Sequence, residues 1–202
     1  MPKVRFFQNP RCPSLNGEPN VSKLLIASPR EWVEVVLANF DAFLLDHATC
    51  ERKASATALS LVSHYPDRPE LVRDMLLLAR EELEHFHQTI WLVQAAGLVL
   101  GRDEKDLYIQ GLRKEIRKGS EDYFLDRLLV SGIVEARGCE RFGLVADALE
   151  AGPLKNFYQD ITRSESRHHM LFYRLAQNYF DASLVDERQG ELFECEAAVL
   201  RS

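Results

Sequence analysis

Two Glu-x-x-His motifs, Glu82 to His85 and Glu165 to His168, carry the residues of this sequence that are best suited to binding a metal. Residues three apart lie on one face of a helix, so each motif can aim a carboxylate and an imidazole at the same point. Both motifs interrupt apolar seams that recur at steps of four and three residues, which is the pattern of a helix facing a bundle core. We therefore expect both motifs to be buried.

Two further apolar seams each contain a single glutamate, Glu51 in one and Glu135 in the other. The interval from Glu51 to Glu82 is 31 residues and that from Glu135 to Glu165 is 30, which predicts two similar helical hairpins. Buried carboxylates repel one another unless cations neutralise them. Four glutamates and two histidines are the ligand set of two-metal sites in helical bundles, and imidazole suits iron. The predicted metal ligands are Glu51, Glu82, His85, Glu135, Glu165 and His168.

A simpler interpretation places Glu-x-x-His motifs on solvated helix surfaces, where single copies are common. Two copies in register with apolar seams favour the metal site instead. A register shifted by one residue, which uses Glu81 and His169, is disfavoured because the helix faces through these residues carry further polar side chains. His169 is expected at the surface or its boundary. His47, one turn before Glu51, is either a partner of that ligand or a structural histidine, and the structural role is favoured. Tyr158 is expected to be a packing residue of the core rather than a redox tyrosine.

The positions of the prolines indicate where long helices can form. Five of the eight prolines fall within the first 29 residues, and residues 70–152 contain none. Because proline ends or kinks a helix, long helices are expected after an irregular N-terminal segment. Ser28 is the predicted N-cap of the first helix, ahead of Pro29, and Gly97 ends the second. The expected helices cover about 29–63 with a break near 39–41, 69–96, 104–117, 121–151, 154–179 and 183–200.

These signals predict an all-α four-helix bundle with extra short helices, in one domain spanning residues 1–202. The composition, 46% hydrophobic and 28% charged, is that of a chain with a buried core. The sequence has no apolar stretch long enough to span a bilayer and no apolar region after its first basic residues. We therefore expect a cytoplasmic protein without a membrane association. The formal charge of −6 excludes nucleic-acid binding through bulk positive charge.

Four segments around the predicted ligands resemble the bacterial tRNA-(2-methylthio-N6-isopentenyladenosine-37) hydroxylase family, and the resemblance extends over about residues 1–200. It implies a ferritin-like fold and a non-haem di-iron monooxygenase. The family uses dioxygen and two electrons to hydroxylate the isopentenyl group of the adenosine next to the tRNA anticodon. All six positions that correspond to its iron ligands hold the expected residue types. The segments are DHATCERKAS, LAREELEHF, DRLLVSGIVEARGCERF and ITRSESRHHMLFYRLA.

The resemblance implies two iron ions as cofactor, dioxygen as co-substrate, a tRNA with a prenylated adenosine as partner, and an unidentified electron-transfer partner. An apolar cavity must hold the prenyl chain, and local basic clusters must contact phosphates. The candidate cavity residues are Phe43, Phe124, Phe142 and Phe172. The candidate RNA contacts are Lys3, Arg5, Arg11, Arg113, Lys114, Arg117 and Lys118.

Three other functions use the same bundle. A di-iron hydroxylase of a small lipid or quinone precursor shares the ligand order, although no exposed amphipathic helix for docking on a membrane is evident. Ferritin-like iron oxidation and storage needs no organic substrate, but such chains generally lack the second Glu-x-x-His motif. A two-manganese catalase is a weaker alternative.

Overall fold

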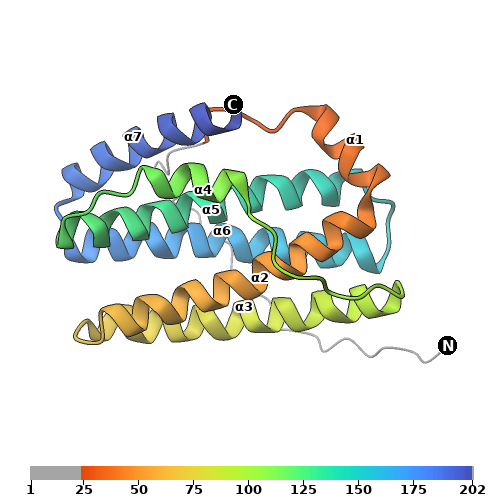
Figure 1. The fold of residues 1–202 in the computed structure, drawn as a ribbon, viewed down its shortest axis with the longest axis horizontal. Coiled ribbons are helices and arrows are strands. Elements are labelled where there is room, and N and C mark those ends of the chain that lie inside the picture. Colours follow the sequence, from red (N-terminus) through yellow and green to blue (C-terminus); the bar gives the residue numbers. More distant parts are fainter. Residues whose placement is uncertain (1–23, 202) are drawn as a thin grey trace.

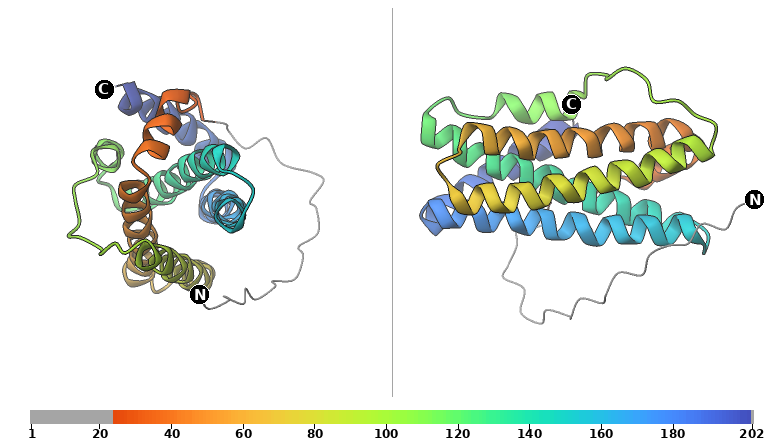
Figure 2. Two further views of the ribbon diagram at one scale, coloured as in Figure 1. Left: turned by 90° about the vertical axis from the view of Figure 1, so that its right-hand side faces the viewer. Right: turned by 90° about the horizontal axis from the view of Figure 1, so that it is seen from below.

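Four long helices dominate the protein, whose computed structural model describes residues 24–201: α2 (Phe40–His64), α3 (Pro69–Ala95), α5 (Ser120–Ala148) and α6 (Pro153–Tyr179). They run side by side as two hairpins, α2 with α3 and α5 with α6 (Figures 1 and 2). The described residues contain no strand, and the all-α class is confirmed. The irregular segment predicted at the N-terminus lies in residues 1–23, outside the described range.

Three further helices cover this bundle: α1 (Arg30–Ala38), α4 (Leu107–Lys114) and α7 (Ala182–Arg201). α7 packs against α4, α5 and α6, and α1 packs against α2 and α5. In Figure 1, α7 and α4 lie above α5, on the side of the bundle away from α3. Among the described helices, none combines the length and the apolar character that a membrane span requires.

The helix ends follow the predicted signals at most positions. Pro69 and Pro153 begin α3 and α6. The first N–H groups of a helix have no partner within the helix, so proline loses no hydrogen bond there, and its fixed φ suits the helical backbone. α3 ends at Ala95 with Ala96 as its C-cap, and the next residue is Gly97, whose φ of 74° is accessible to glycine at little cost. The break predicted near residues 39–41 is the junction between α1 and α2 at Asn39.

The prediction that Ser28 caps the first helix is wrong. α1 begins at Arg30, and its N-cap is Pro29, with no side chain that accepts a capping hydrogen bond. Ser28 instead donates its hydroxyl to Glu140 Oε2 at 2.7 Å and its backbone N–H to Glu140 Oε1 at 2.5 Å. The Ser28 hydroxyl therefore faces α5, where it donates to this carboxylate in a charge-assisted hydrogen bond and accepts from Arg137 and Arg141, instead of accepting from the N–H groups of α1.

The buried Arg137 of α5 holds the outer elements on the bundle. Its side chain is only 2% exposed and contacts both carboxylate oxygens of Glu196 in α7, at 2.9 and 3.1 Å. It also donates to Glu140 at 2.9 Å and to the backbone oxygen of Ile26 at 2.8 Å. Tyr108 of α4 donates to the same Glu196 at 3.1 Å. One guanidinium thus links α5 to α7 and to the segment before α1.

Apolar clusters lie on both sides of the middle of the bundle. The larger cluster includes Leu71 and Met75 of α3 and Leu128 of α5, and the smaller includes Val145 and Tyr158. On α2, α5 and α6 the predicted metal ligands fall between these two clusters, and on α3 they fall between the larger cluster and a third one that contains Val93. They therefore lie in a part of the core that water reaches little.

Candidate metal centre

The four long helices bring all six predicted ligands to one place in the core. Each helix contributes at its midpoint, and none of the six residues is more than 9% exposed. The contributions are Glu51 from α2, Glu82 and His85 from α3, Glu135 from α5, and Glu165 and His168 from α6. This burial agrees with the expectation that the glutamates and histidines within the apolar seams face the core.

The six side chains form two overlapping groups, each able to hold one ion. Glu51, Glu82, His85 and Glu165 offer ligand atoms within 4.8 Å of one another, and so do Glu82, Glu135, Glu165 and His168. Glu82 and Glu165 belong to both groups, whereas each group has one glutamate and one histidine of its own. This is the arrangement of two neighbouring ions that share bridging carboxylates.

The hydrogen bonding within the cluster is incomplete, which fits side chains that serve as metal ligands. His168 Nδ1 lies 2.7 Å from Glu82 Oε1, but these two buried atoms have no hydrogen-bond partner. Buried polar atoms are normally satisfied, and those that are not call for a specific explanation. An ion placed between them would accept lone pairs from both, and the oxygen and imidazole donors suit iron.

Burial and mutual repulsion raise the pKa values of two carboxyl groups in the cluster. Burial raises the pKa of Glu135 to about 7, with added repulsion from Glu82 and Glu51. Burial, followed by repulsion from Glu135, raises the pKa of Glu165 well above its ordinary value. Without a cation, the folded protein therefore opposes ionisation of these groups, whereas binding a divalent cation would favour it.

The histidines experience the same negative field. Burial opposes protonation of His85, but hydrogen bonds to Glu51 and Glu82 outweigh it and raise the pKa to about 9. For His168, burial is likewise outweighed by Glu81 and Glu82, and the pKa rises to about 10. Since a metal ligand must be deprotonated, metal binding would displace these protons.

Glu135→Gln is expected to stabilise the metal-free protein by about 1–3 kcal/mol at neutral pH, because one pKa unit corresponds to about 1.4 kcal/mol. A raised carboxyl pKa means that folding opposes ionisation of Glu135. The free energy of unfolding therefore falls as the pH rises from the pKa of the unfolded state to the pKa of the folded state. Glutamine does not ionise, so it removes this loss of stability. Urea unfolding of the metal-free protein measures the change, with the exposed Glu150→Gln as control. A less stable variant would contradict the reasoning.

His47 and Tyr158 extend the cluster beyond Glu51. His47 Nε2 lies 2.6 Å from Glu51 Oε1, and His47 Nδ1 lies 3.3 Å from the Tyr158 hydroxyl. Because the carboxylate can only accept, Nε2 carries the proton and Nδ1 accepts from the tyrosine. His47 is therefore more than a structural histidine, since it orients a predicted ligand. Its position one turn before Glu51 was the sequence signal for this contact.

Two residues near the α6 motif differ from the expectations. His169 is buried, and its Nδ1 donates to the backbone oxygen of Gly132 at 2.7 Å. The surface position predicted for His169 is therefore wrong, because a backbone carbonyl on α5 compensates its burial. Glu81, rejected as a ligand, lies outside the cluster but contacts His168 Nε2 at 3.4 Å. Spacing along the chain could not reveal this contact, because it joins two helices.

A glycine leaves room for one of the carboxylates. A Cβ added at Gly138 of α5 would meet Glu165 Oε2 at 3.2 Å, which is closer than such contacts normally are. The missing side chain lets the Glu165 carboxylate lie against the α5 backbone. Gly138 occupies the predicted core seam of α5, three residues after Glu135.

The four candidate cavity residues separate into two pairs. Phe43 and Phe142 pack around His47, with ring-centroid distances of 6.2 and 4.5 Å, so they lie beside the cluster. Phe124 stacks with Tyr65 at 4.3 Å, at the end of the bundle where α2 terminates. Phe172 belongs to the same large apolar cluster as Phe124. The structure thus places only the first pair next to His47.

The candidate RNA contacts differ in their availability. Arg113, Lys114 and Lys118 are exposed at or just after α4. Arg117 instead binds the buried Asp126 through two side-chain hydrogen bonds of 2.8 and 3.0 Å, so it already has an internal partner. Lys3, Arg5 and Arg11 lie outside the described residues.

Comparisons with known proteins assign the chain to a family. The family model described as tRNA-(MS[2]IO[6]A)-hydroxylase (MiaE) matches residues 17–202. The chain belongs to the MiaE family. A Pseudomonas putida relative is 38% identical over 154 residues, which cover 76% of this chain and 75% of the relative. A Salmonella typhimurium relative is 28% identical over a match that covers 91% of this chain and 86% of the relative. Both are named tRNA 2-(methylsulfanyl)-N(6)-isopentenyladenosine(37) hydroxylase.

A solved structure supports the ferritin-like architecture of this MiaE family chain. It is named Protein 43 with aldehyde deformylating oxygenase activity, from Synechococcus, and its TM-score to this chain is 0.86. The two are 36% identical, and the match covers 89% of this chain and 90% of the other. The ferritin-like fold that the resemblance implied is confirmed. Because the family consists of hydroxylases, the protein that contains this buried Glu and His cluster is an oxidoreductase.

Proposed function

We propose that the protein hydroxylates the isopentenyl group of 2-methylthio-N6-isopentenyladenosine at position 37 of tRNA, with two iron ions as cofactor and dioxygen as co-substrate. The observation that carries this proposal is the pair of overlapping buried ligand groups in a member of a tRNA hydroxylase family. Bound iron would supply the redox chemistry that an unactivated C–H bond requires. The reaction inserts one oxygen atom into the C–H bond and reduces the other to water, consuming two electrons and two protons.

We assign each ligand a role in this centre from the two groups. Glu82 and Glu165, which belong to both groups, would be shared by the two ions, while Glu51 and His85 would complete one site and Glu135 and His168 the other. His47 orients Glu51 through its 2.6 Å hydrogen bond. Burial of all six ligands keeps bulk water from the reacting centre. Because the ligands come from four helices, we further propose that the chain acts as a single ferritin-like domain.

We propose that Phe43 and Phe142 form an apolar wall near the prenyl chain, since they pack on His47 beside the cluster. We propose that the exposed Arg113, Lys114 and Lys118 contact tRNA phosphates. Their substitution would weaken tRNA binding in a salt-dependent manner. The two electrons require a redox partner, which we expect to be a separate protein.

Gain of function in a bacterial host tests the proposal. The host makes the prenylated, methylthiolated nucleoside but does not hydroxylate it, and receives either this gene or its Glu135→Ala variant. Mass analysis of nucleosides from purified tRNA should reveal the nucleoside with one added oxygen only with the wild-type gene. The host should also co-express a suitable reductase and contain abundant, iron-loaded wild-type protein. If the prenylated nucleoside still gains no oxygen under these conditions, the proposed substrate is wrong.

A further inference from the structure

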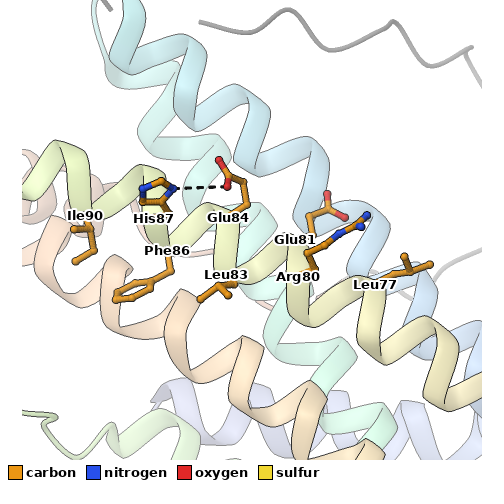
Figure 3. A pocket seen from close by; sticks show the side chains of 8 residues that line it. All are labelled: Leu77, Arg80, Glu81, Leu83, Glu84, Phe86, His87 and Ile90. Carbon is orange, nitrogen blue, oxygen red and sulfur yellow. Dashed lines mark ion pairs between the residues drawn. The ribbon is translucent and has the colours of Figure 1, made fainter.

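Glu81 of α3 links the candidate metal centre to the surface between α3 and α6. Its Oε2 lies 3.4 Å from His168 Nε2, while its Oε1 accepts from Ser164 Oγ and from Arg167, each at 2.6 Å. The Glu81 side chain is 40% exposed and the His168 side chain 3%. In Figure 3, Glu81 lies next to the α6 ribbon, whereas Glu84, one turn along, pairs with His87 on the same helix.

The two nitrogens of His168 face different surroundings. Nδ1 points into the cluster, 2.7 Å from Glu82 Oε1, and Nε2 faces Glu81 and Ser164, each at 3.4 Å. Each nitrogen therefore lies beside a carboxylate, which can only accept a hydrogen bond. An ion bound in the cluster would take the lone pair of Nδ1, and the proton of the neutral imidazole would then lie on Nε2. Glu81 lies where its carboxylate can accept a hydrogen bond from that proton.

His85, the matching histidine of α3, has no such support among the described residues. Its contacts run from Nδ1 to Glu82 at 3.3 Å and to Glu51 at 3.6 Å, both within the cluster. The residue before the motif is Glu81 in α3 but Ser164 in α6, so the two hairpins differ at this position. Both Glu81 and Ser164 lie by the same histidine, His168. The pseudo-symmetry of the six ligands therefore does not extend to their surroundings.

We propose that Glu81 is a positioning residue that orients His168 and makes the ion site of Glu135 and His168 the tighter of the two. This inference rests on the metal centre in the proposed function. A carboxylate that accepts from the distal nitrogen of a metal-bound histidine fixes its orientation and increases its basicity. Ser164 and Arg167 hold the Glu81 carboxylate in place from α6, across the seam between the hairpins.

Anaerobic titration of the metal-free full-length protein with Co²⁺ or Fe²⁺ alone tests this inference. Absorption spectra and equilibrium dialysis would follow the number and affinity of the bound ions. The wild type should bind two ions per chain. Glu81→Ala should bind the ion of the His168 site about 10- to 100-fold more weakly, with the other site unchanged. Glu81→Gln should recover part of the affinity, because its amide oxygen still accepts a hydrogen bond.

Glu84→Ala is the matched control, since Glu84 lies on the same helix and contacts His87 outside the cluster. Circular dichroism and urea unfolding establish that each variant is folded. Unchanged binding in folded Glu81→Ala, or equal weakening of both sites, overturns the role of Glu81 and leaves the metal centre standing. If the wild-type protein binds no ion tightly, the proposed metal centre fails instead.

Discussion

Glu165→Ala is expected to remove both metal ions and to reduce hydroxylation to background. Glu165 is one of two carboxylates common to the overlapping ligand groups, so its loss leaves each ion with an incomplete site. Metal analysis after anaerobic reconstitution with Fe²⁺, together with turnover of modified tRNA, would measure both effects. The exposed Glu150→Ala should retain two ions and full activity.

Glu51→Ala provides the contrast that makes this prediction specific. Glu51 belongs to only one group, so this variant should lose one ion and keep the ion of Glu135 and His168. If Glu165→Ala and Glu51→Ala lose the same single ion, the assignment of Glu165 as a bridging ligand is wrong. Retention of two ions in Glu165→Ala would contradict the whole centre.

Arg137→Met is expected to lower the free energy of unfolding by about 3–5 kcal/mol. The substitution removes the cation from a buried ion pair and leaves Glu196, which is fully buried, without its charged partner. Breaking a buried pair on one side costs this much because the remaining charge stays desolvated. Urea unfolding monitored by circular dichroism would measure the loss, and α7 should be the helix most affected.

The double variant Arg137→Met/Glu196→Leu tests the physical cause. Replacing both partners by apolar residues removes the unpaired charge, so most of the lost stability should return. Arg201→Met, on the exposed end of α7, is the control and should change stability by less than about 0.5 kcal/mol. If the double variant is less stable than Arg137→Met, the unpaired charge of Glu196 is not the cause of the lost stability. The attraction between Arg137 and Glu196 then stabilises the fold by more than the desolvation of the two charges costs.

Local features of the chain were enough to predict the helices and the faces that they turn inward. Proline positions set the starts of α3 and α6, and Gly97 set the end of α3, which closes at Ala95. The interrupted apolar seams selected the six cluster residues, because a glutamate in a seam is buried wherever the seam is buried. These features depend on local backbone preference and helical periodicity, which one chain segment contains in full.

How side chains from different helices meet depends on the packing of the whole bundle. That Glu82 and Glu165 belong to both ligand groups, and that Glu81 of α3 reaches His168 of α6, depends on how the helices cross and rotate. His169 was misplaced because its burial depends on a carbonyl of another helix. Periodicity gives the face of a helix that points inward but not the partner that it meets there, since that partner is set by packing between segments distant in sequence.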